Sequence, residues 1–188
     1  MSPRPSISLT SISIAPGDPS YSQMLSWEFR DEFVHRLLVN DIPQRIRQFR
    51  CRVLGFYDPQ NELVGFGSYE ISDVWSKITG KTYHAYIPLL AVNPACERRG
   101  HGASILRRLI EEVAVIIAHM QISRLDVSPD IFLDVYQDSL GAMNLYKANG
   151  FQQIAGPFVD PEANGKEYIV MACRLDINCS HAFPHKPV

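Results

Sequence analysis

The residues best suited to chemistry form a glycine-rich segment near the middle of the chain. Gly100 and Gly102 lack a Cβ, so backbone N–H groups can approach a pyrophosphate closely there. A helix beginning at this point adds unpaired N–H groups and the positive end of its dipole. The preceding arginines supply fixed cationic donors. We call this segment the cradle and interpret it as an anion-binding site made of Arg98, Arg99, Gly100, His101, Gly102, Ala103 and Ser104.

The flanking segments favour an anion site over the simpler alternative, an ordinary turn on a solvated basic surface. Residues 86–92 upstream form an apolar run with the length of a buried strand, and apolar residues recur at helical spacing from Ile105 to Met120 downstream. The cradle therefore lies between a strand and a helix. Dinucleotide-binding folds share this arrangement, but their fingerprint needs a third glycine where this chain has Ile105, so we reject a Rossmann fold.

The segment resembles the signature of the GNAT superfamily of acetyl-CoA-dependent N-acetyltransferases. In that signature a strand ending in apolar-x-Pro precedes Gln/Arg-x-x-Gly-x-Gly/Ala, and Val92, Pro94, Gly100 and Gly102 match it in register. A second block of the family is matched by Leu133, Val135, Ala142, Leu145, Tyr146, Gly150 and Phe151. Two blocks at the expected separation are more specific than either alone.

Two positions depart from the family pattern. Glu97 stands where the family usually has Gln or Arg, and a carboxylate about 4 Å from a phosphate is repelled by about 1 kcal/mol even in water. Arg98 and Arg99 can offset this repulsion. Ser139 stands where the family often has an Asn that bonds the pantetheine arm, and the shorter hydroxyl needs a bridging water to do the same.

The resemblance implies a single α/β GNAT-like domain over residues 6–175, followed by a C-terminal tail over 176–188. The central sheet is expected to be mixed and mostly antiparallel, with about seven strands, flanking helices, and fourth and fifth strands that are parallel and splayed. The patterning places these strands at 7–14, 52–57, 62–71, 83–92, 131–135, 151–155 and 167–175. Helices are predicted from residue 19 to about Asn40, over 42–49, over 102–120 and over 139–149. Four arginines of the second helix region could attract an anionic acceptor, but we interpret them as a solvated face: Arg45, Arg47, Arg50 and Arg52.

The composition excludes several other classes of protein. The 188 residues carry a formal net charge of −2, so neither nucleic acid nor an anionic membrane surface is an expected partner. The four cysteines show no metal-ligand spacing, which argues against a metal site and indicates a reducing compartment. No apolar run approaches the roughly 20 residues of a membrane span. We expect a cytoplasmic location, and the oligomeric state stays open.

The resemblance also implies the reaction and its cosubstrate. An acceptor amine attacks the thioester of acetyl-CoA directly, and CoA leaves as a thiolate. Carried over from the family, Leu90, Ala91 and Val92 lie beside the pantetheine arm. Tyr146 is the candidate acid that protonates the thiolate. If Gly150 ends its helix in the left-handed conformation, Phe151 should pack on Tyr146 and hold the phenol still; the alternative is that Tyr146 only packs.

The base is less clearly indicated. Some family members carry Glu or His on the fourth strand at the position of Tyr86, but a phenol with a pKa near 10 is a poor base at neutral pH. His84 lies two residues earlier on the same strand face, titrates in the useful range, and could act through a water held by Tyr86. The alternative is a structural histidine. Glu70 and Asp73, near the end of the third strand, are weaker rivals.

The sequence therefore predicts an N-acetyltransferase that moves an acetyl group from acetyl-CoA to a primary amine. Small metabolites or antibiotics, polyamines, and protein N-termini or lysines all stay open as acceptors, because loops that vary within the scaffold form the acceptor site. A different class is a catalytically idle acyl-CoA-binding sensor or interaction module. Glu97 and Ser139 favour that alternative slightly, whereas Tyr146 argues against it.

Overall fold

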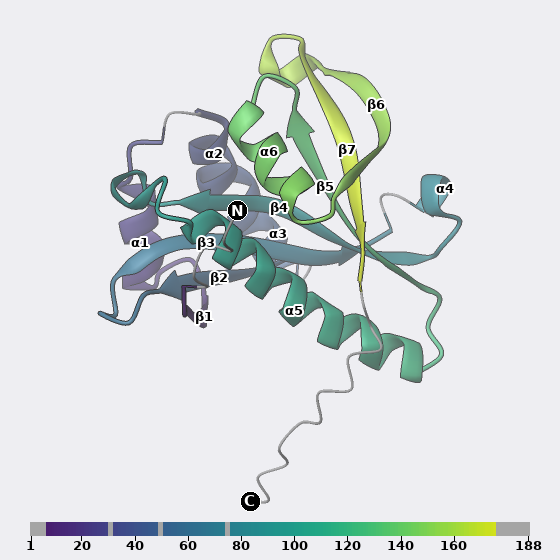
Figure 1. The fold of residues 1–188 in the computed structure, drawn as a ribbon, viewed down its shortest axis with the longest axis horizontal. Coiled ribbons are helices and arrows are strands. Elements are labelled where there is room, and N and C mark those ends of the chain that lie inside the picture. The colour runs from purple at the N-terminus through teal and green to yellow at the C-terminus, as the bar shows by residue number, and fades with distance from the viewer. Residues whose placement is uncertain (1–6, 30–31, 49–50, 74–75, 176–188) are drawn as a thin grey trace, which may run out of the picture.

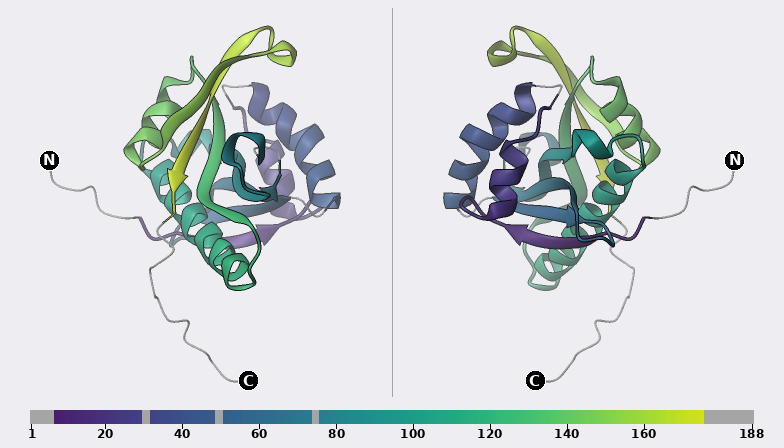
Figure 2. Two further views of the ribbon diagram at one scale, coloured as in Figure 1. Left: turned by 90° about the vertical axis from the view of Figure 1, so that its right-hand side faces the viewer. Right: turned by 90° about the vertical axis from the view of Figure 1, so that its left-hand side faces the viewer.

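The computed structural model describes residues 7–29, 32–48, 51–73 and 76–175. The predicted tail, the first residue of the predicted domain and Arg50 lie outside the described residues. One seven-stranded sheet runs through the molecule, with helices on both faces (Figures 1 and 2). The strands are β1 Thr10–Ile14, β2 Cys51–Tyr57, β3 Leu63–Ser72, β4 Tyr83–Val92, β5 Val127–Tyr136, β6 Gln152–Asp160 and β7 Lys166–Arg174.

The sheet has the order β1-β2-β3-β4-β5-β7-β6. Only β4 and β5 are parallel, and every other neighbouring pair is antiparallel. The long crossover helix α5 (His101–Ile122) joins β4 to β5, as a parallel connection requires. The predicted mixed, mostly antiparallel α/β sheet with parallel fourth and fifth strands is confirmed.

Two apolar cores cover the two faces of the sheet. The α5-side core contains Ile105, Leu109 and Val113 of the predicted apolar stripe, together with Ile117, and the stripe residues Ile116 and Met120 pack against it partly buried. The opposite core lies under three short helices, α1 (Pro19–Leu25), α2 (Glu32–Arg36) and α3 (Ile42–Arg47). Figure 2 shows these helices and α5 on opposite sides of the sheet.

The single helix predicted from residue 19 to Asn40 is wrong. Helix α1 ends at Leu25, and the chain resumes as α2, a π-helical turn over Leu37–Asp41, and then α3. The Ser26 hydroxyl donates to the Gln23 carbonyl, which supports a helix end. The rings of Trp27 and Phe29 lie 5.9 and 6.0 Å from that of Phe66 on β3. Packing on the sheet therefore overrides the helical spacing of the apolar residues.

A β-bulge in β4 changes which face each of its side chains occupies. Tyr69 on β3 opposes two residues of β4, Ile87 and Pro88. Proline has no N–H to donate to a ladder, so a bulge is one of the few places where a central strand accepts it. The extra residue reverses the alternation: Ile87 faces the α5-side core, whereas Leu89 faces the core under α1–α3.

Strands β4 and β5 separate immediately after this region. Their parallel ladder contains Tyr83, Ala85 and Tyr86 on β4 and ends where Tyr86 pairs with Phe132. From Ile87 onward, β4 keeps its pairing with β3 but has no ladder partner on the β5 side. The predicted splay is confirmed, and it opens the sheet at its centre.

Candidate active site

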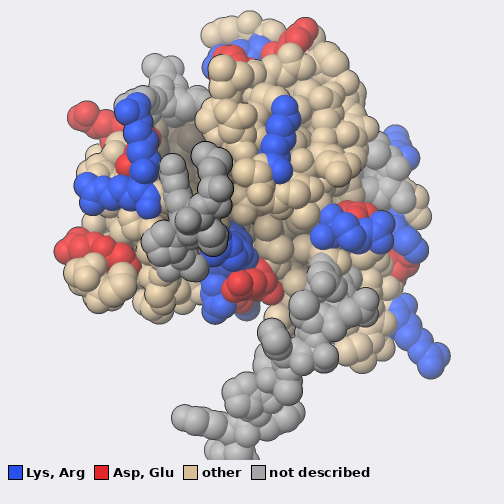
Figure 3. Space-filling view, viewed as in Figure 1, with Lys and Arg blue, Asp and Glu red and all other residues tan. Residues whose placement is uncertain are grey.

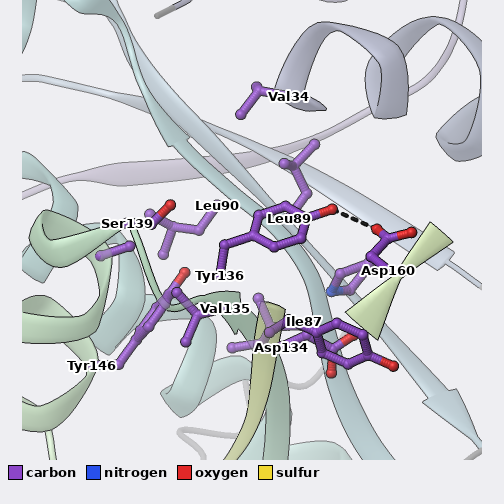
Figure 4. Close-up of a pocket in the computed structure, with 13 residues that line it drawn as sticks. Val34, Ile87, Leu89, Leu90, Asp134, Val135, Tyr136, Ser139, Tyr146 and Asp160 are labelled. Carbon is purple, nitrogen blue, oxygen red and sulfur yellow. Dashed lines mark hydrogen bonds between the residues drawn. The ribbon is translucent and has the colours of Figure 1, made fainter. Parts of the chain in front are cut away.

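A cavity of about 350 Å³ lies where β4 and β5 separate. Its size is within the usual range of small-molecule sites. Figure 4 shows its walls, which come from α2, β4, β5, α6 (Leu140–Ala148) and the β6–β7 pair. The lining residues are Val34, Ile87, Pro88, Leu89, Leu90, Asp134, Val135, Tyr136, Ser139, Ala142, Tyr146, Asp160 and Tyr168.

Tyr146 is held at the α6 wall by the helix end that follows it. Gly150 has φ +89°, the Phe151 N–H donates to the Tyr146 carbonyl (3.1 Å), and the Gly150 N–H donates to the Lys147 carbonyl (3.2 Å). These are the two bonds of a Schellman motif. The Tyr146 and Phe151 ring centroids lie 5.7 Å apart, so the predicted contact is confirmed. Tyr146 is 8% exposed, and burial raises its pKa to about 12.

The cradle begins helix α5 as predicted. Gly100 is the N-cap with φ +90°, and Arg98 also has a left-handed φ of +61°. The helical ladder starts with the bond from the Ser104 N–H to the Gly100 carbonyl (3.3 Å), so the N–H groups of His101, Gly102 and Ala103 precede that ladder. Their position suits an anion at the helix start.

Gly102 was expected to lie in the turn, where a positive φ would require glycine, but its position in the structure differs. It lies inside the helix, and positive φ belongs to Gly100 instead. A Cβ on Gly102 would stand 3.5 Å from the side chains of Leu145 and Val92. Gly102 therefore sits where the start of α5 faces both α6 and β4, and a larger side chain would fill the space between them.

The other predicted coenzyme residues are divided between several environments. Leu90 and Ser139 line the cavity, and Val92 packs at the edge of the α5-side core. Ala91 faces the opposite core. Arg98 and Arg99 are exposed, whereas His101 and Ser104 are each 8% exposed. The structure thus brings the pantetheine and pyrophosphate candidates to one side of the sheet, with Ala91 behind them.

The two predicted base candidates share a face of β4, and neither of them lines the cavity. His84 is completely buried, with its ring 5.3 Å from that of Phe132. Burial lowers its pKa, although the charge of Asp73 opposes this shift. Tyr86 lies closer to the splay, and its hydroxyl donates to Asp134 Oδ2 (2.8 Å). Burial and the adjacent Asp134 raise the pKa of Tyr86 well above its ordinary value.

Asp134 is a carboxylate of the cavity that the sequence analysis missed. It lies on β5, accepts the hydrogen bond of Tyr86 and faces the cavity from the β5 wall (Figure 4). Asp134 keeps an exposed surface, while the protein around its carboxylate group raises its pKa to about 6 against the Tyr86 hydrogen bond and the charge of Arg45. The sequence did contain a signal for this residue. Asp134 is a charged residue between Leu133 and Val135, and because those two apolar side chains face the α5-side core, alternation along the strand places Asp134 on the other face.

Arg45 and Glu70 form an ion pair behind Tyr86. Arg45 Nη1 lies 3.1 Å from both carboxylate oxygens of Glu70, which is 5% exposed and pairs with Tyr86 in the sheet. The interpretation of Arg45 as part of a solvated face is therefore wrong: its partner lies on β3, at a distance in sequence that helical patterning does not detect. The two weaker base candidates, Glu70 and Asp73, lie in different surroundings: Glu70 is buried in this ion pair, whereas Asp73 is exposed.

Charges elsewhere are dispersed. On the face drawn in Figure 3, Lys and Arg side chains are scattered and several lie beside acidic ones. Within the described ranges, no group of three or more His, Cys, Asp or Glu residues is arranged to hold a metal ion. Cys51, Cys96 and Cys173 are free thiols. No helix in the described part of the chain has both the length and the apolar character to span a membrane.

Comparisons with solved structures agree with this architecture. The chain is similar to spermidine N-acetyltransferase from Vibrio cholerae in complex with CoA and spermine (TM-score 0.60, 18% identity, 89% of this chain and 95% of that chain). It is also similar to an IAA acetyltransferase from Bacillus cereus (TM-score 0.60, 13% identity, 89% and 100%). A third is a ribosomal-protein alanine N-acetyltransferase from Escherichia coli (TM-score 0.55, 15% identity, 94% and 99%). At these identities the likeness shows the fold.

Sequence comparison identifies the family. No curated protein matches the chain. The model of the Acetyltransferase (GNAT) family matches residues 19–151, which span the three N-terminal helices, the cradle, the splayed strands and α6. Members of this family transfer acyl groups from acyl-CoA to an acceptor. The family match and the splayed parallel strands beside a glycine-capped helix agree, and the chain belongs to the GNAT acetyltransferase family.

Proposed function

We propose that this protein is an N-acetyltransferase that moves an acetyl group from acetyl-CoA to a primary amine by direct attack. The arrangement of Asp134 and Tyr146 around one cavity is the observation that carries the proposal. One is a carboxylate that titrates near neutral pH, and the other is a phenol that stays protonated there. Groups whose surroundings separate their pKa values in this way suit a base and an acid.

In the proposed reaction, each chemical step is assigned to a particular group of the protein. Asp134 accepts the proton that the amine must lose, directly or through a water. The amine nitrogen forms its bond to the acetyl carbon, and backbone N–H groups of the splayed β4 stabilise the oxyanion. The carbon–sulfur bond then breaks, and the Tyr146 hydroxyl gives its proton to the departing sulfur. The N-terminus of α5, with Arg98 and Arg99, binds the pyrophosphate of the cosubstrate.

Asp134 is preferred to the two residues of β4 as the base. His84 has no exposed surface and does not line the cavity, so an amine in the cavity would need a relay to reach it. Tyr86 has a raised pKa and donates its proton to Asp134 in a hydrogen bond. We assign Tyr86 the role of orienting the carboxylate. The acceptors named for the similar structures, spermidine and a ribosomal protein's alanine, are amines and support this class of acceptor.

Thiol release from acetyl-CoA over a panel of primary amines tests the proposal. We expect the wild-type protein to release thiol, and Asp134→Asn to reduce kcat by about 10² or more with little change in acetyl-CoA affinity. Asp138→Asn is the matched control, because it removes the same charge outside the cavity. A wild-type protein that binds acetyl-CoA but releases no thiol with any amine is instead the catalytically idle module, and contradicts the proposal.

A further inference from the structure

The wall of the cavity formed by β5, β6 and β7 carries a second carboxylate, Asp160. It lies at the end of β6, where its Oδ2 accepts a hydrogen bond from the Tyr136 hydroxyl (2.6 Å) and its Oδ1 accepts one from the Ala163 N–H (3.3 Å). Figure 4 shows the bond between Tyr136 and Asp160 at the cavity wall. Two donors from different elements therefore fix this carboxylate in one orientation.

The lining of the cavity is acidic and aromatic. It contains two carboxylates, Asp134 and Asp160, three tyrosines, and no Lys, Arg or His among the described residues. Two cations near these walls have partners of their own. Lys166 pairs with Asp138 (3.3 Å) and stands over the Tyr136 ring, and Arg45 pairs with Glu70. Lys166 stands opposite Asp160 in the β6–β7 pair, and its ammonium pairs with Asp138. The side chains that line the cavity are therefore acidic in balance.

Tyr168 lies within electrostatic range of both carboxylates. Burial is the main cause that raises the pKa of Tyr168, and the negative charges of Asp134 and Asp160 raise it further. Its ring and that of Tyr136 are neighbours in the sheet and both line the cavity. Aromatic faces beside carboxylates favour an ammonium group through cation–π attraction.

The cavity also presents a polar atom that has no protein partner. Tyr146 is 8% exposed and faces the cavity, and none of the hydrogen bonds found among the described residues uses its hydroxyl. The hydroxyl is open to the cavity, where a water or a bound ligand can form a hydrogen bond with it.

We propose that the acceptor is a small linear diamine or polyamine, whose reacting amine lies at Asp134 and whose second ammonium binds Asp160 between Tyr136 and Tyr168. This inference rests on the proposed function and names its substrate class. The apolar side chains of Val34, Ile87 and Leu89 line the same cavity and suit a methylene chain between two charged ends. Asp160 is then a specificity residue, and Tyr136 positions it.

Comparing matched acceptors tests the second ammonium site. 1,4-Diaminobutane and butylamine share the chain length and the reacting amine, and 4-amino-1-butanol replaces the second ammonium by a neutral polar group. A charge-assisted hydrogen bond corresponds to about ten-fold or more in kcat/KM. We expect the wild-type protein to prefer the diamine over both other acceptors by about this factor, mainly through KM.

Asp160→Asn removes the charge, keeps one oxygen that can accept from the Ala163 N–H, and places an amide NH2 that can donate to the Tyr136 hydroxyl oxygen. We expect it to lower kcat/KM for the diamine by about ten-fold more than for butylamine. Glu111→Gln, which removes an exposed charge of α5 outside the cavity, should leave the ratio of the two acceptors unchanged. A wild-type ratio near one, an equal loss with both acceptors, or better turnover of an N-terminal peptide than of every diamine overturns the proposal.

Binding separates this proposal from the proposed function. If no amine releases thiol, the acyl transfer fails as a function, and calorimetric titration of 1,4-diaminobutane in the presence of CoA still measures the second site. Binding that weakens about ten-fold in Asp160→Asn and is unchanged in Glu111→Gln supports the diamine site. Equal binding to the wild-type and Asp160→Asn proteins, or no binding to either, overturns it.

Discussion

The Tyr86 hydroxyl donates a 2.8 Å hydrogen bond to Asp134 across the point where β4 and β5 separate. This pair connects the last rung of the parallel ladder to the wall of the cavity. The surrounding protein atoms raise the pKa of Asp134 to about 6 although the residue keeps an exposed surface, and the pKa of Tyr86 rises well above its ordinary value. Near neutral pH the proton between the two groups therefore stays on the Tyr86 phenol, and the Asp134 carboxylate is deprotonated and can act as a base.

The pH dependence of kcat/KM should report Asp134. A base must be deprotonated, so the rate should rise with pH through about 6 and then level off. In Asp134→Asn, the residual kcat/KM should no longer change with pH in this range. His84→Ala provides the comparison: if it abolishes the same limb and Asp134→Asn retains it, the base is the histidine. Steady-state kinetics between about pH 5 and 9 would measure both profiles.

The same carboxylate should make folding stability pH-dependent in the opposite sense from most acidic residues. Its pKa is raised above the unfolded value, so the folded state binds more protons between about pH 4 and 6 and stability falls as pH rises through that window. Asp134→Asn should remove this fall and raise the unfolding free energy at pH 7, on the order of 1 kcal/mol after allowance for solvent in the cavity. Urea unfolding of both proteins at pH 5 and pH 7 is the measurement, and a variant less stable than wild type at pH 7 would contradict it.

Tyr146→Phe should slow the reaction without unfolding the protein. The ring, its contact with Phe151 and the Schellman bonds all stay, and only the hydroxyl is lost. General acids contribute about 10²- to 10⁴-fold, mostly in kcat, so acetyl-CoA affinity should change little. Since the pKa of Tyr146 is about 12, no falling limb from this residue is expected below about pH 10. Wild-type turnover by Tyr146→Phe, with chemistry rate-limiting, would mean that the phenol only packs.

Gly102→Val should weaken acetyl-CoA binding while the fold is kept. The new side chain would occupy the space between Leu145 and Val92 at the start of α5, and its Cβ alone meets ordinary contact distances. We expect a loss of about ten-fold or more in affinity by calorimetry. Gly141→Val is the matched control, since a Cβ there meets nothing within 4 Å. Unchanged affinity in Gly102→Val would contradict the location of the cradle at the start of α5.

Removing Arg45 should affect both stability and the base. Arg45→Met leaves Glu70, which is 5% exposed, without its ion-pair partner, and breaking such a pair costs about 3 kcal/mol. It also removes a positive charge that lowers the pKa of Asp134, so the rising limb of the pH profile should shift above its wild-type position. The double variant Arg45→Met with Glu70→Leu should recover much of the stability but keep the shifted limb. A limb that does not move would show that Arg45 does not influence Asp134.

Several parts of the site could be predicted from the sequence because they depend on neighbours along the chain. The glycine N-cap of α5 requires a residue that accepts positive φ, and Gly100 has φ +90°. The end of α6 depends on Gly150, with Phe151 one residue further on, and both bonds of that motif are local. The strand order near the cradle follows from a crossover helix between two parallel strands.

The positions of the carboxylates around the cavity depend on the tertiary structure. Asp134 joins Tyr86 from a strand 48 residues away, and Asp160 reaches Tyr136 from the end of a later strand. Arg45 leaves its predicted solvated face because Glu70 lies opposite it in the fold. The bulge at Pro88 also reverses the alternation of β4, so counting along the strand cannot assign faces beyond it. Local patterns fix the backbone of the candidate coenzyme site, whereas long-range register alone decides which carboxylates line the cavity.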